Sequence, residues 1–414
     1  MRVLIVTHYF PPEIGAPQAR LSALASIWAA GGDDVTVLTG MPSHPTGVLP
    51  PAYRRAVFRR ERADGYRVLR TWLYATPNEG VARKTLGHLS FMASSVLLGG
   101  RAAGRADVVL VSSPTFFSIL SGWLLARMKR ARFVVEVRDL WPAIFVELGV
   151  LTNRRVIALL ERLELAAYAV ADQVVVVSDG FRADLIRRGV PPAKVHTIRN
   201  GVDTARFTAA TGAGRDWRAR LGAGAGDCLV LYAGTHGISQ ALPAIADAAA
   251  RVAAQPGGAS VRFAFVGDGG DKRRLERRVA ELGLRNTVLL PGVPHEQMPE
   301  LLAAADICLV PLRDVPLFAT FIPSKMFECL AAGKTVVGSV TGEAAQLLAE
   351  AGAVVVPPED SGALAAAIGA LAADGELRAV LGKAGRAFAE RRCDRAALAR
   401  QYRKVLDQAL ACAR

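Results

Sequence analysis

The chain has 414 residues, of which 51% are hydrophobic and 21% are charged, and its 51 Lys and Arg exceed its 37 Asp and Glu by 14. This composition buries sizeable cores and excludes a wholly disordered protein, while the length predicts two or three domains. The net charge favours an anionic partner such as nucleic acid, phospholipid headgroups or a phosphorylated substrate. No segment has the roughly 20 apolar residues of a membrane-spanning helix. The opening MRVLIVTHYFPP lacks the apolar run of a secretory signal.

The five cysteines all lie in the second half and have neither CxxC nor zinc-ligand spacing. They are expected to be reduced packing residues, as in a cytoplasmic protein. We therefore expect a cytoplasmic chain, held at most at the inner surface of the cell membrane. Its oligomeric state does not follow from the sequence.

Short β-branched runs alternate with longer helical patterns through the first half of the chain. The expected strands are residues 2–6, 34–38, 107–111, 133–137 and 173–177. The clearest helical patterns between them are residues 20–30 and 154–171. Apolar strands that alternate with helices predict a parallel sheet covered on both faces.

The first candidate binding loop, residues 9–20, comes directly after the first expected strand. Gly15 in this loop lets backbone N–H groups approach a ligand, and the helix that follows presents its positive end. An ordinary strand-to-helix connection with two prolines is the alternative, and the loop alone does not decide between them.

Residues 54–105 hold 11 of the cations and only three anions, so this short region carries over half of the excess charge. Its second part contains LGHLSFMASSVLLGG (residues 86–100), which is too short to span a bilayer. With basic flanks, the region is consistent with contact at an anionic membrane surface. A buried helix explains the apolar segment equally well, and the arginine-rich part is also compatible with nucleic-acid binding.

Arg138 and Asp139 follow the expected strand 133–137, within the segment EVRDLWP. At the carboxyl end of a parallel strand they are candidates for a substrate-binding site. We interpret Asp139 as a hydrogen-bond acceptor for a substrate and Arg138 as a ligand for an anionic group. An interlocked structural Arg–Asp pair is the alternative.

The domain boundary is expected after residue 207, since Asn200-Gly201 is a turn signal and residues 208–226 are rich in Gly and Ala, as in a linker. We therefore expect an N-terminal domain over residues 1–207 and a second domain over 227–390. The terminal segment 391–414 is expected to be a helix that packs back on the N-terminal domain. The strands expected in the second domain are residues 228–232, 262–266, 287–290, 307–311, 335–337 and 353–356.

Two glycine-containing loops follow strands of the second domain. The first holds Gly234, Thr235 and His236, and the second, GDGGDK, holds Gly267, Gly269 and Lys272. Glycines at the carboxyl end of a strand in a doubly wound sheet are typical of nucleotide sites. A short glycine loop alone is weak evidence, because a turn into a helix has the same composition.

Five segments in this order resemble the GT-B glycosyltransferases of the large retaining family 4. They are HYFPPEIGAPQAR (8–20), EVRDLWP (136–142), NGVDTARF (200–207), FVGDGGDKRRL (265–275) and PSKMFECLAAGKTVV (323–337). Among family members, the first two segments most resemble bacterial O-antigen and capsule enzymes, including N-acetyl-fucosaminyl transferases. The resemblance implies an α/β GT-B fold in which two Rossmann-like, doubly wound domains face each other across a cleft.

The resemblance also assigns roles to residues of the second domain. Glu328 matches the later of two family glutamates and is expected to bind the ribose hydroxyls of the donor, since a carboxylate accepts two donors. Thr320 stands where the first glutamate is expected, so the sugar contact passes to Thr320 itself or to backbone groups near Phe321. Lys325 is expected to neutralise the diphosphate leaving group, with Arg138 and Asp139 completing the catalytic set. Gly15, Gly234, Thr235, His236, Gly267, Gly269 and Lys272 are expected around the donor.

The function that follows is transfer of a sugar, expected to be an N-acetylated amino or deoxy hexose, from a UDP-sugar to a lipid-linked or saccharide acceptor in cell-surface polysaccharide synthesis. No Asp-x-Asp sequence accompanies these motifs, so neither a metal nor a cofactor is expected. A nucleotide-sugar epimerase on the same fold is the alternative enzyme. A basic nucleic-acid-binding protein is the non-enzymatic alternative, although we expect no nucleic-acid partner.

Overall fold

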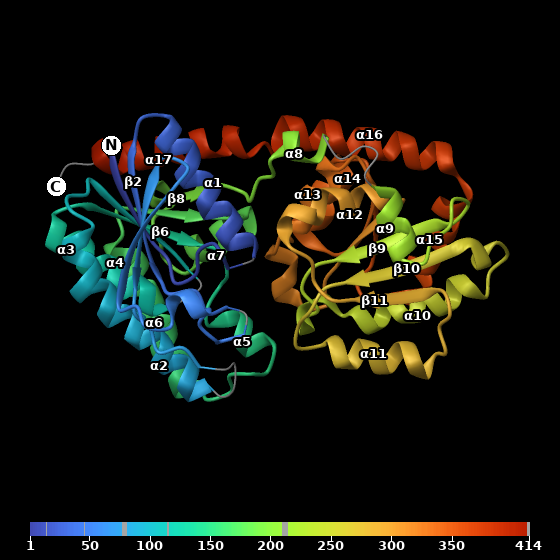
Figure 1. Ribbon diagram of the computed structural model, residues 1–414, viewed down its shortest axis with the longest axis horizontal. Coiled ribbons are helices and arrows are strands. Elements are labelled where there is room, and N and C mark those ends of the chain that lie inside the picture. The colour runs from blue at the N-terminus through green and yellow to red at the C-terminus, as the bar shows by residue number, and fades with distance from the viewer. Residues whose placement is uncertain (14, 45, 77–80, 114–115, 209–213, 412–414) are drawn as a thin grey trace. The chain divides into compact units, whose positions relative to one another are not determined.

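The computed structural model describes the chain except for residues 14, 45, 77–80, 114–115, 209–213 and 412–414. It divides into two compact units, Met1–Arg199 with Ala396–Arg414, and Asn200–Arg395. Each unit has one sheet with helices on both faces (Figure 1). The division falls at Asn200, earlier than the boundary we expected after residue 207. The reason is that Val202 pairs with the end of the second unit, donating from its amide to the carbonyl of Cys393 at 2.9 Å.

The sheet of the first unit has eight strands in the order β3-β4-β2-β1-β5-β6-β7-β8. The strands are β1 (Arg2–Val6), β2 (Asp34–Gly40), β3 (Phe58–Ala63), β4 (Tyr66–Thr71), β5 (Val108–Ser112), β6 (Arg132–Val137), β7 (Gln173–Val176) and β8 (Val195–Thr197). All neighbouring strands are parallel except β3 and β4. The expected parallel core is therefore present, because β-branched strands apolar on both faces are buried by helices on each side.

The helices of this unit are α1 (Ala16–Ala30), α2 (Val81–Ser94), α3 (Gly100–Ala102), α4 (Phe116–Lys129), α5 (Ala143–Glu147), α6 (Arg154–Val170), α7 (Asp179–Arg187) and, from Ala396 on, α17 (Arg395–Ala411). A π-helical segment, η2 (Ser95–Gly99), joins α2 to α3, and short 3₁₀ turns lie at η1 (Pro51–Tyr53) and η3 (Pro192–Lys194). The terminal helix α17 places Ala399, Tyr402, Leu406 and Ala409 in the core that also contains Trp28. Their spacing of three or four residues is that of one buried helix face.

The arginine-rich run of residues 54–70 forms an antiparallel hairpin of β3 and β4 at the edge of the sheet. Arg70 is buried, and it donates to the Glu61 carboxylate at 2.7 Å and to the carbonyls of Gly40 and Pro11. Arg67 pairs with Asp34. We expected this run to form a basic surface. That expectation is wrong for Arg70, because its guanidinium is buried and bonded to acceptors within the first unit.

The apolar segment 86–100 has two different surroundings. Phe91, Ser95 and Gly99 are buried in the first unit, whereas Leu86 and Leu97 are 54% and 75% exposed. The buried-helix interpretation therefore holds for one face of this segment, while contact with a membrane stays a prediction. None of the helices among the described residues is both long enough and apolar enough to cross a membrane.

The sheet of the second unit has six parallel strands in the order β11-β10-β9-β12-β13-β14. The strands are β9 (Cys228–Ala233), β10 (Val261–Val266), β11 (Thr287–Leu290), β12 (Ile307–Pro311), β13 (Thr335–Ser339) and β14 (Val354–Val356). The order reverses between β9 and β12, and in doubly wound sheets ligands bind at the carboxyl ends of the strands beside such a reversal.

The helices of this unit are α8 (Thr204–Thr208), α9 (Gly214–Arg220), α10 (Leu242–Ala253), α11 (Lys272–Glu281), α12 (Met298–Ala304), α13 (Lys325–Ala331), α14 (Gly342–Glu350), α15 (Ser361–Ala373) and α16 (Gly375–Arg392). Its 3₁₀ turns are η4 (Ile238–Gln240), η5 (Gly258–Ser260), η6 (His295–Gln297) and η7 (Pro316–Thr320).

The segment 208–226, expected to be a linker, includes helix α9. Trp217 on α9 is buried, and Arg218 pairs with Asp306 at 2.8 Å. The helix forms because these two side chains have partners within the second unit. Residues 209–213 of the expected linker lie outside the described residues.

Candidate functional site

Lys325 lies at the start of α13 and its ammonium contacts the aromatic side chain of Tyr232. Its Nζ stands 3.7 Å from the centre of the Tyr232 ring and donates to Tyr232 Oη. The Tyr232 hydroxyl in turn donates to the carbonyl of Thr235 at 2.6 Å, which fixes its direction. Loss of hydration around the ammonium lowers the pKa of Lys325 to about 7. The site thus holds a cation that a bound anion would stabilise.

Gly234 is the residue that lets this cation approach the loop after β9. Its φ of +134° lies in a region that favours glycine, and a Cβ at this position would stand 2.9 Å from Lys325 Nζ. Position 234 therefore requires glycine, because of its backbone conformation and its closeness to Lys325. The next residue, Thr235, contributes the carbonyl that orients Tyr232.

The two glycine loops of the second unit interlock at His236. The His236 amide donates to the Asp268 carbonyl, and the Asp271 amide donates to the His236 carbonyl, both at 2.9 Å. A Cβ on Gly267 would stand 1.8 Å from the Gly234 carbonyl oxygen, and one on Gly269 would stand 2.3 Å from that of His236. These glycines are thus required by loop packing, quite apart from any ligand.

The His236 ring is fully buried, and neither of its nitrogens has a hydrogen-bond partner among the described residues. Burial, reinforced by the nearby charges of Lys272 and Lys325, lowers the pKa of His236 to about 4. The ring is therefore neutral at physiological pH, with one N–H to donate.

Lys272 is held within its own loop. It pairs with Asp268 at 2.6 Å and donates to the carbonyl of Gly267 at 3.0 Å. The hydrogen bond from Lys272 is the main reason that the pKa of Asp268 is lowered. Lys272, which we expected to bind the nucleotide-sugar donor, therefore also has a structural role, because it holds its own loop together.

Glu328 belongs to a chain of three polar side chains that sequence reasoning did not assemble. His295 Nε2 lies 2.9 Å from Glu328 Oε1, and Arg206 Nη1 lies 2.9 Å from His295 Nδ1. Because a guanidinium can only donate, Nδ1 accepts and the Nε2–H donates to Glu328. The second carboxylate oxygen, Oε2, has no partner among the described residues and is available to a ligand.

Thr320 and Phe321 lie at the end of η7. The Thr320 hydroxyl donates to the carbonyl of Leu317 at 2.8 Å, and the Phe321 ring meets Phe318 edge to face. Thr320 thus closes a helical turn, a role that the sequence did not indicate.

Arg138 and Asp139 follow β6 in the first unit, as expected. Arg138 Nε donates to the carbonyl of Ser113 at 2.8 Å. Among the described residues, Arg138 and Asp139 form no ion pair with each other, whereas the nearby Glu136 is fully buried and pairs with Arg20 at 2.9 Å. Burial raises the pKa of Asp139 and lowers that of Arg138. Both side chains keep functional groups for a substrate.

Gly15 is the N-cap residue of α1, with extended backbone. A Cβ at Gly15 would lie 2.4 Å from Gln18 Oε1, and this buried amide oxygen has no partner among the described residues. Ile14, also in this loop, is outside the described part of the chain.

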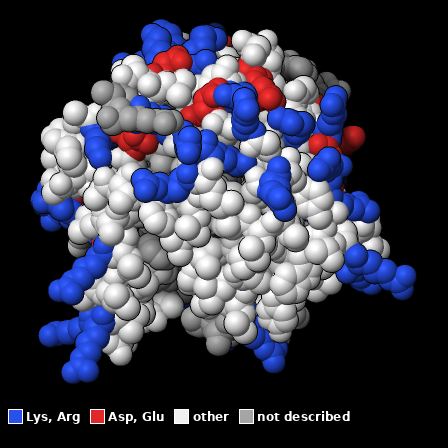
Figure 2. All heavy atoms as spheres, turned by 90° about the vertical axis from the view of Figure 1, so that its left-hand side faces the viewer, with Lys and Arg blue, Asp and Glu red and all other residues white. Residues whose placement is uncertain are grey.

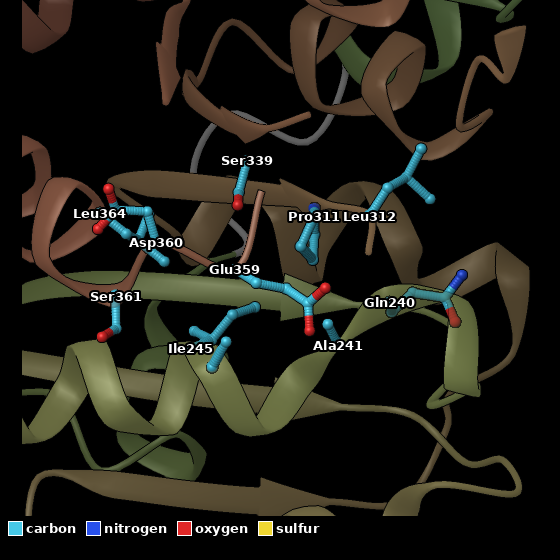
Figure 3. Close-up of a pocket in the computed structure, with 11 residues that line it drawn as sticks. Gln240, Ala241, Ile245, Pro311, Leu312, Ser339, Glu359, Asp360, Ser361 and Leu364 are labelled. Carbon is cyan, nitrogen blue, oxygen red and sulfur yellow. The ribbon is translucent and has the colours of Figure 1, made fainter. Parts of the chain in front are cut away.

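A small hollow at the carboxyl ends of β12 and β13 is distinct from the Lys325 site. It is lined by residues that include Gln240, Ser339 and Glu359 (Figure 3), and its volume is about 10 Å³. That volume holds about one water molecule, so it is too small for a substrate. Over the residues that the structure describes, no group of three or more His, Cys, Asp and Glu side chains is placed to bind a metal.

Two family matches cover most of the chain. Residues 15–201 match the family described as glycosyl transferase 4-like domain, and residues 227–374 match the glycosyl transferases group 1 family. The two matches correspond to the two units of the structure.

Curated relatives extend over both units. The chain is 29% identical to the "Putative colanic acid biosynthesis glycosyl transferase WcaI" of Escherichia coli (strain K12), across 97% of this chain and 98% of that relative. It is also 27% identical to the GDP-mannose-dependent alpha-(1-6)-phosphatidylinositol monomannoside mannosyltransferase of Mycolicibacterium smegmatis, across 69% of this chain and 81% of that one.

Solved structures share the fold over the full length. Sucrose-phosphate synthase from Thermosynechococcus elongatus aligns with a TM-score of 0.76 at 22% identity and covers 100% of both chains. Anabaena Alr3699/HepE in complex with UDP and glucose aligns with a TM-score of 0.73 at 20% identity, across 98% of this chain and 99% of that one.

Proposed function

This chain is a GT-B glycosyltransferase of the family 4 type, and from that premise we propose that it transfers a sugar from a UDP-sugar to a lipid-linked or saccharide acceptor during cell-surface polysaccharide synthesis. The relative named for colanic acid biosynthesis supports this setting. The second unit binds the donor and the first unit binds the acceptor. The transferred sugar is an N-acetylated amino or deoxy hexose, and the configuration at its anomeric carbon is retained.

The observation that carries the proposal is the Lys325 ammonium held over Tyr232 beside Gly234. When the bond to the sugar breaks, negative charge develops on the departing nucleotide diphosphate. An ammonium fixed next to that group stabilises the transition state more than the ground state. The bound diphosphate also raises the pKa of Lys325 again, so the lysine carries its charge when it is needed. Protein cations and dipoles thus take the part of a metal.

Glu328 recognises the nucleoside in this proposal. Its Oε2 accepts hydrogen bonds from the ribose hydroxyls, while His295 fixes the position of the carboxylate through Oε1. The neutral His236 donates its single ring N–H to the donor phosphates once the ligand is bound. Asp139 and Arg138 of the first unit contact the reacting sugars.

Uridine is proposed as the base because of the resemblance to N-acetyl-fucosaminyl transferases, and the HepE complex with UDP supports it. Guanosine is the second candidate, because the mycobacterial relative is named for its use of GDP-mannose. The two bases are compared directly in the experiment below.

A thermal-shift screen of UDP-sugars and GDP-sugars tests the donor site. A ligand present at about 100 times its dissociation constant stabilises the protein by about 2.7 kcal/mol, which is readily measured. Lys325→Ala and Glu328→Ala are expected to abolish the shift, whereas Lys383→Ala and Glu376→Ala are matched controls on exposed parts of α16. If no nucleotide sugar shifts the wild-type protein, the proposal is wrong.

Product analysis separates the alternative enzyme. Incubation with the identified nucleotide sugar and no acceptor is expected to leave it unchanged, because transfer needs a second substrate. Formation of an epimer would establish the epimerase instead. Nucleic-acid binding would appear as an affinity that falls steeply with salt and is unaffected by Glu328→Ala.

We further infer that the chain works at the inner surface of an anionic membrane. The π-helical segment η2 and helices α4 and α6 of the first unit expose apolar side chains that include Leu97 (75%), Met128 (62%) and Leu159 (56%). On the face shown in Figure 2, a broad uncharged area has Lys and Arg at its margins. Apolar contact combined with basic margins is the pattern of interfacial binding.

Co-sedimentation with vesicles tests this inference. Binding to vesicles that contain phosphatidylglycerol is expected to exceed binding to pure phosphatidylcholine, and to weaken in Leu97→Asp with Met128→Asp. Leu377→Asp, at a leucine of the second unit that is 40% exposed, is the control. Equal binding by the double variant and the wild type would contradict the inference.

A further inference from the structure

A pocket of about 230 Å³ in the first unit is lined by three histidines from separate parts of the chain. His8 follows β1, His44 follows β2, and His88 lies on α2. The carboxyl ends of these parallel strands meet at one edge of the sheet, where α2 also contributes Lys84. The pocket is smaller than the ~300–1,000 Å³ typical of a drug-sized ligand, so it suits a compact group.

The rings in this pocket lie close together, with His8 buried, His88 half-buried and His44 exposed. His8 is 6% exposed, and its Nδ1 lies 3.5 Å from Nδ1 of His88. The ring of Tyr9 meets His8 edge to face at 4.5 Å and lies 5.0 Å from His44. Burial, followed by the charge of Lys84, lowers the pKa of His44 and of His88. The pocket therefore presents neutral imidazoles and phenolic and hydroxyl groups around one ammonium.

No carboxylate lines the pocket among the described residues. The carboxylate of the nearby Glu13 does not serve the pocket, because both of its oxygens already accept hydrogen bonds from backbone amides. Oε1 accepts from Ser43 and His44 at 2.8 Å each, and Oε2 accepts from Phe10 at 2.9 Å. A site for neutral sugar hydroxyls normally includes a carboxylate as a strong acceptor, whereas this one offers imidazoles, hydroxyl groups and a cation.

We propose that this pocket binds a phosphoryl group of the acceptor, so that the acceptor is a phosphate- or diphosphate-linked saccharide and not a free one. Lys84 supplies the charge, and the imidazole N–H groups of His44 and His88 supply directed hydrogen bonds. The assignment of the phosphoryl group to the acceptor rests on the proposed function. The affinity of the pocket for a phosphoryl group does not.

Direct binding is tested with inorganic pyrophosphate and imidazole NMR. In protein with isotopically labelled histidine, the ring signals of His44 and His88 are assigned through His44→Gln and His88→Gln and then followed during titration. They are expected to shift in the wild type. Lys84→Gln is expected to weaken this binding about tenfold, as for loss of one charge-assisted hydrogen bond.

Arg83→Gln is the matched control, because Arg83 is the exposed neighbour of Lys84 on α2 and does not line the pocket. Its titration is expected to match the wild type. The rings of His236 and His295 in the second unit report separately on the donor site. If only these two respond to pyrophosphate, or if Arg83→Gln and Lys84→Gln behave alike, the pocket is not a phosphoryl site.

A transfer assay tests whether the phosphoryl group belongs to the acceptor. It compares one acceptor sugar in two forms, linked to a short prenyl diphosphate or to an octyl group. Lys84→Gln is expected to raise KM about tenfold for the diphosphate-linked form and to leave KM for the octyl glycoside unchanged. Equal effects on both forms would overturn the assignment to the acceptor. Failure of the proposed function is recognised independently, because it removes transfer in the wild type while the pyrophosphate titration keeps its outcome.

Discussion

Lys325 holds an ammonium where burial disfavours charge, and this lowers its pKa from 10.5 to about 7. The unfolded chain keeps the ordinary value, so from about pH 7 to about pH 10 it binds the extra proton and folding stability rises with pH. Below this range the folded protein bears the full cost of the buried charge. Lys325→Met is therefore expected to raise the free energy of unfolding of the ligand-free protein by about 1–3 kcal/mol near pH 6.

The same variant is expected to lower the rate of sugar transfer by about 100-fold, as for loss of a group that stabilises developing charge. Denaturant unfolding at pH 6 and pH 10 checks the stability, and the gain is expected to shrink at the higher pH. A variant that is both inactive and destabilised at pH 6 would show that the lysine is held by favourable structural contacts instead.

Gly234 gives a second prediction, since a methyl group there would stand 2.9 Å from Lys325 Nζ and 3.2 Å from Cε. Gly234→Ala is expected to displace the ammonium and lower kcat/KM at least about tenfold, with a stability loss of about 1–2 kcal/mol from the backbone conformation. Gly257→Ala is the control, because Gly257 has φ +77° and open space around its Cβ position. Similar losses of activity in both variants would mean that strain alone is responsible.

The donor site could be predicted from the sequence only where a motif is local. Lys325, Gly234 and Glu328 were identified because they stand in short segments with a recognisable pattern. Arg206 and His295 were missed, because their role depends on contact across 89 residues of sequence. The segment 200–207, interpreted as a boundary signal and as a family motif without site residues, supplies Arg206 to the Glu328 chain and Asn200 to Ser324. The predicted ligand contacts are tested by the thermal-shift experiment with Lys325→Ala and Glu328→Ala.

At the scale of elements, the apolar strands were predictable because burial on both faces leaves a continuous β-branched run. Strands β1, β11 and β12 have the predicted bounds. The β3–β4 hairpin was missed, because an edge strand carries alternating exposed arginines and so has the composition of a surface segment. Helix α9 was missed for a similar reason, since its Gly- and Ala-rich surroundings are typical of a linker.

The hairpin distinguishes two kinds of arginine. Arg70 is 2% exposed and is paired with Glu61, so Arg70→Leu leaves that carboxylate without its partner. The expected loss is about 3 kcal/mol of folding stability, as for breaking a buried pair. Arg60→Leu, at an exposed position of β3, is expected to change stability by less than about 0.5 kcal/mol. Chemical denaturation of both variants checks this, and equal losses would contradict the distinction.

At the scale of the whole molecule, the first unit is made of two separate stretches of the chain. Helix α17 closes its core through Tyr402 and Leu406, both fully buried, and Trp28 Nε1 donates to the Ala399 carbonyl at 3.0 Å. Arg403 pairs with Asp33 at 2.6 Å. Burial alone would raise the pKa of Asp33, but the hydrogen bonds from Arg403 and the terminal ammonium lower it overall.

A chain that ends after Arg395 is expected to keep a folded second unit and to lose the first. Removal of two buried side chains of this size costs about 3–6 kcal/mol, which approaches the whole stability of a typical domain. Limited proteolysis with mass spectrometry is expected to yield a resistant fragment near residues 200–395, and fluorescence from Trp28 is expected to report solvent exposure. Survival of an intact fragment from residues 1–199 would show that α17 is dispensable.

Because the chain completes the first unit only after the second unit, the two units also differ in when they can fold during synthesis. The first unit leaves the ribosome early but lacks its last helix until more than 200 further residues have been translated. At about 5–20 residues per second, that delay is roughly 10–40 s. During this interval the surface of α1 around Trp28 is uncovered, while the second unit can already complete its own sheet. The half of the enzyme that is translated last is therefore able to fold first, and the nascent first half is the part that most needs protection from aggregation.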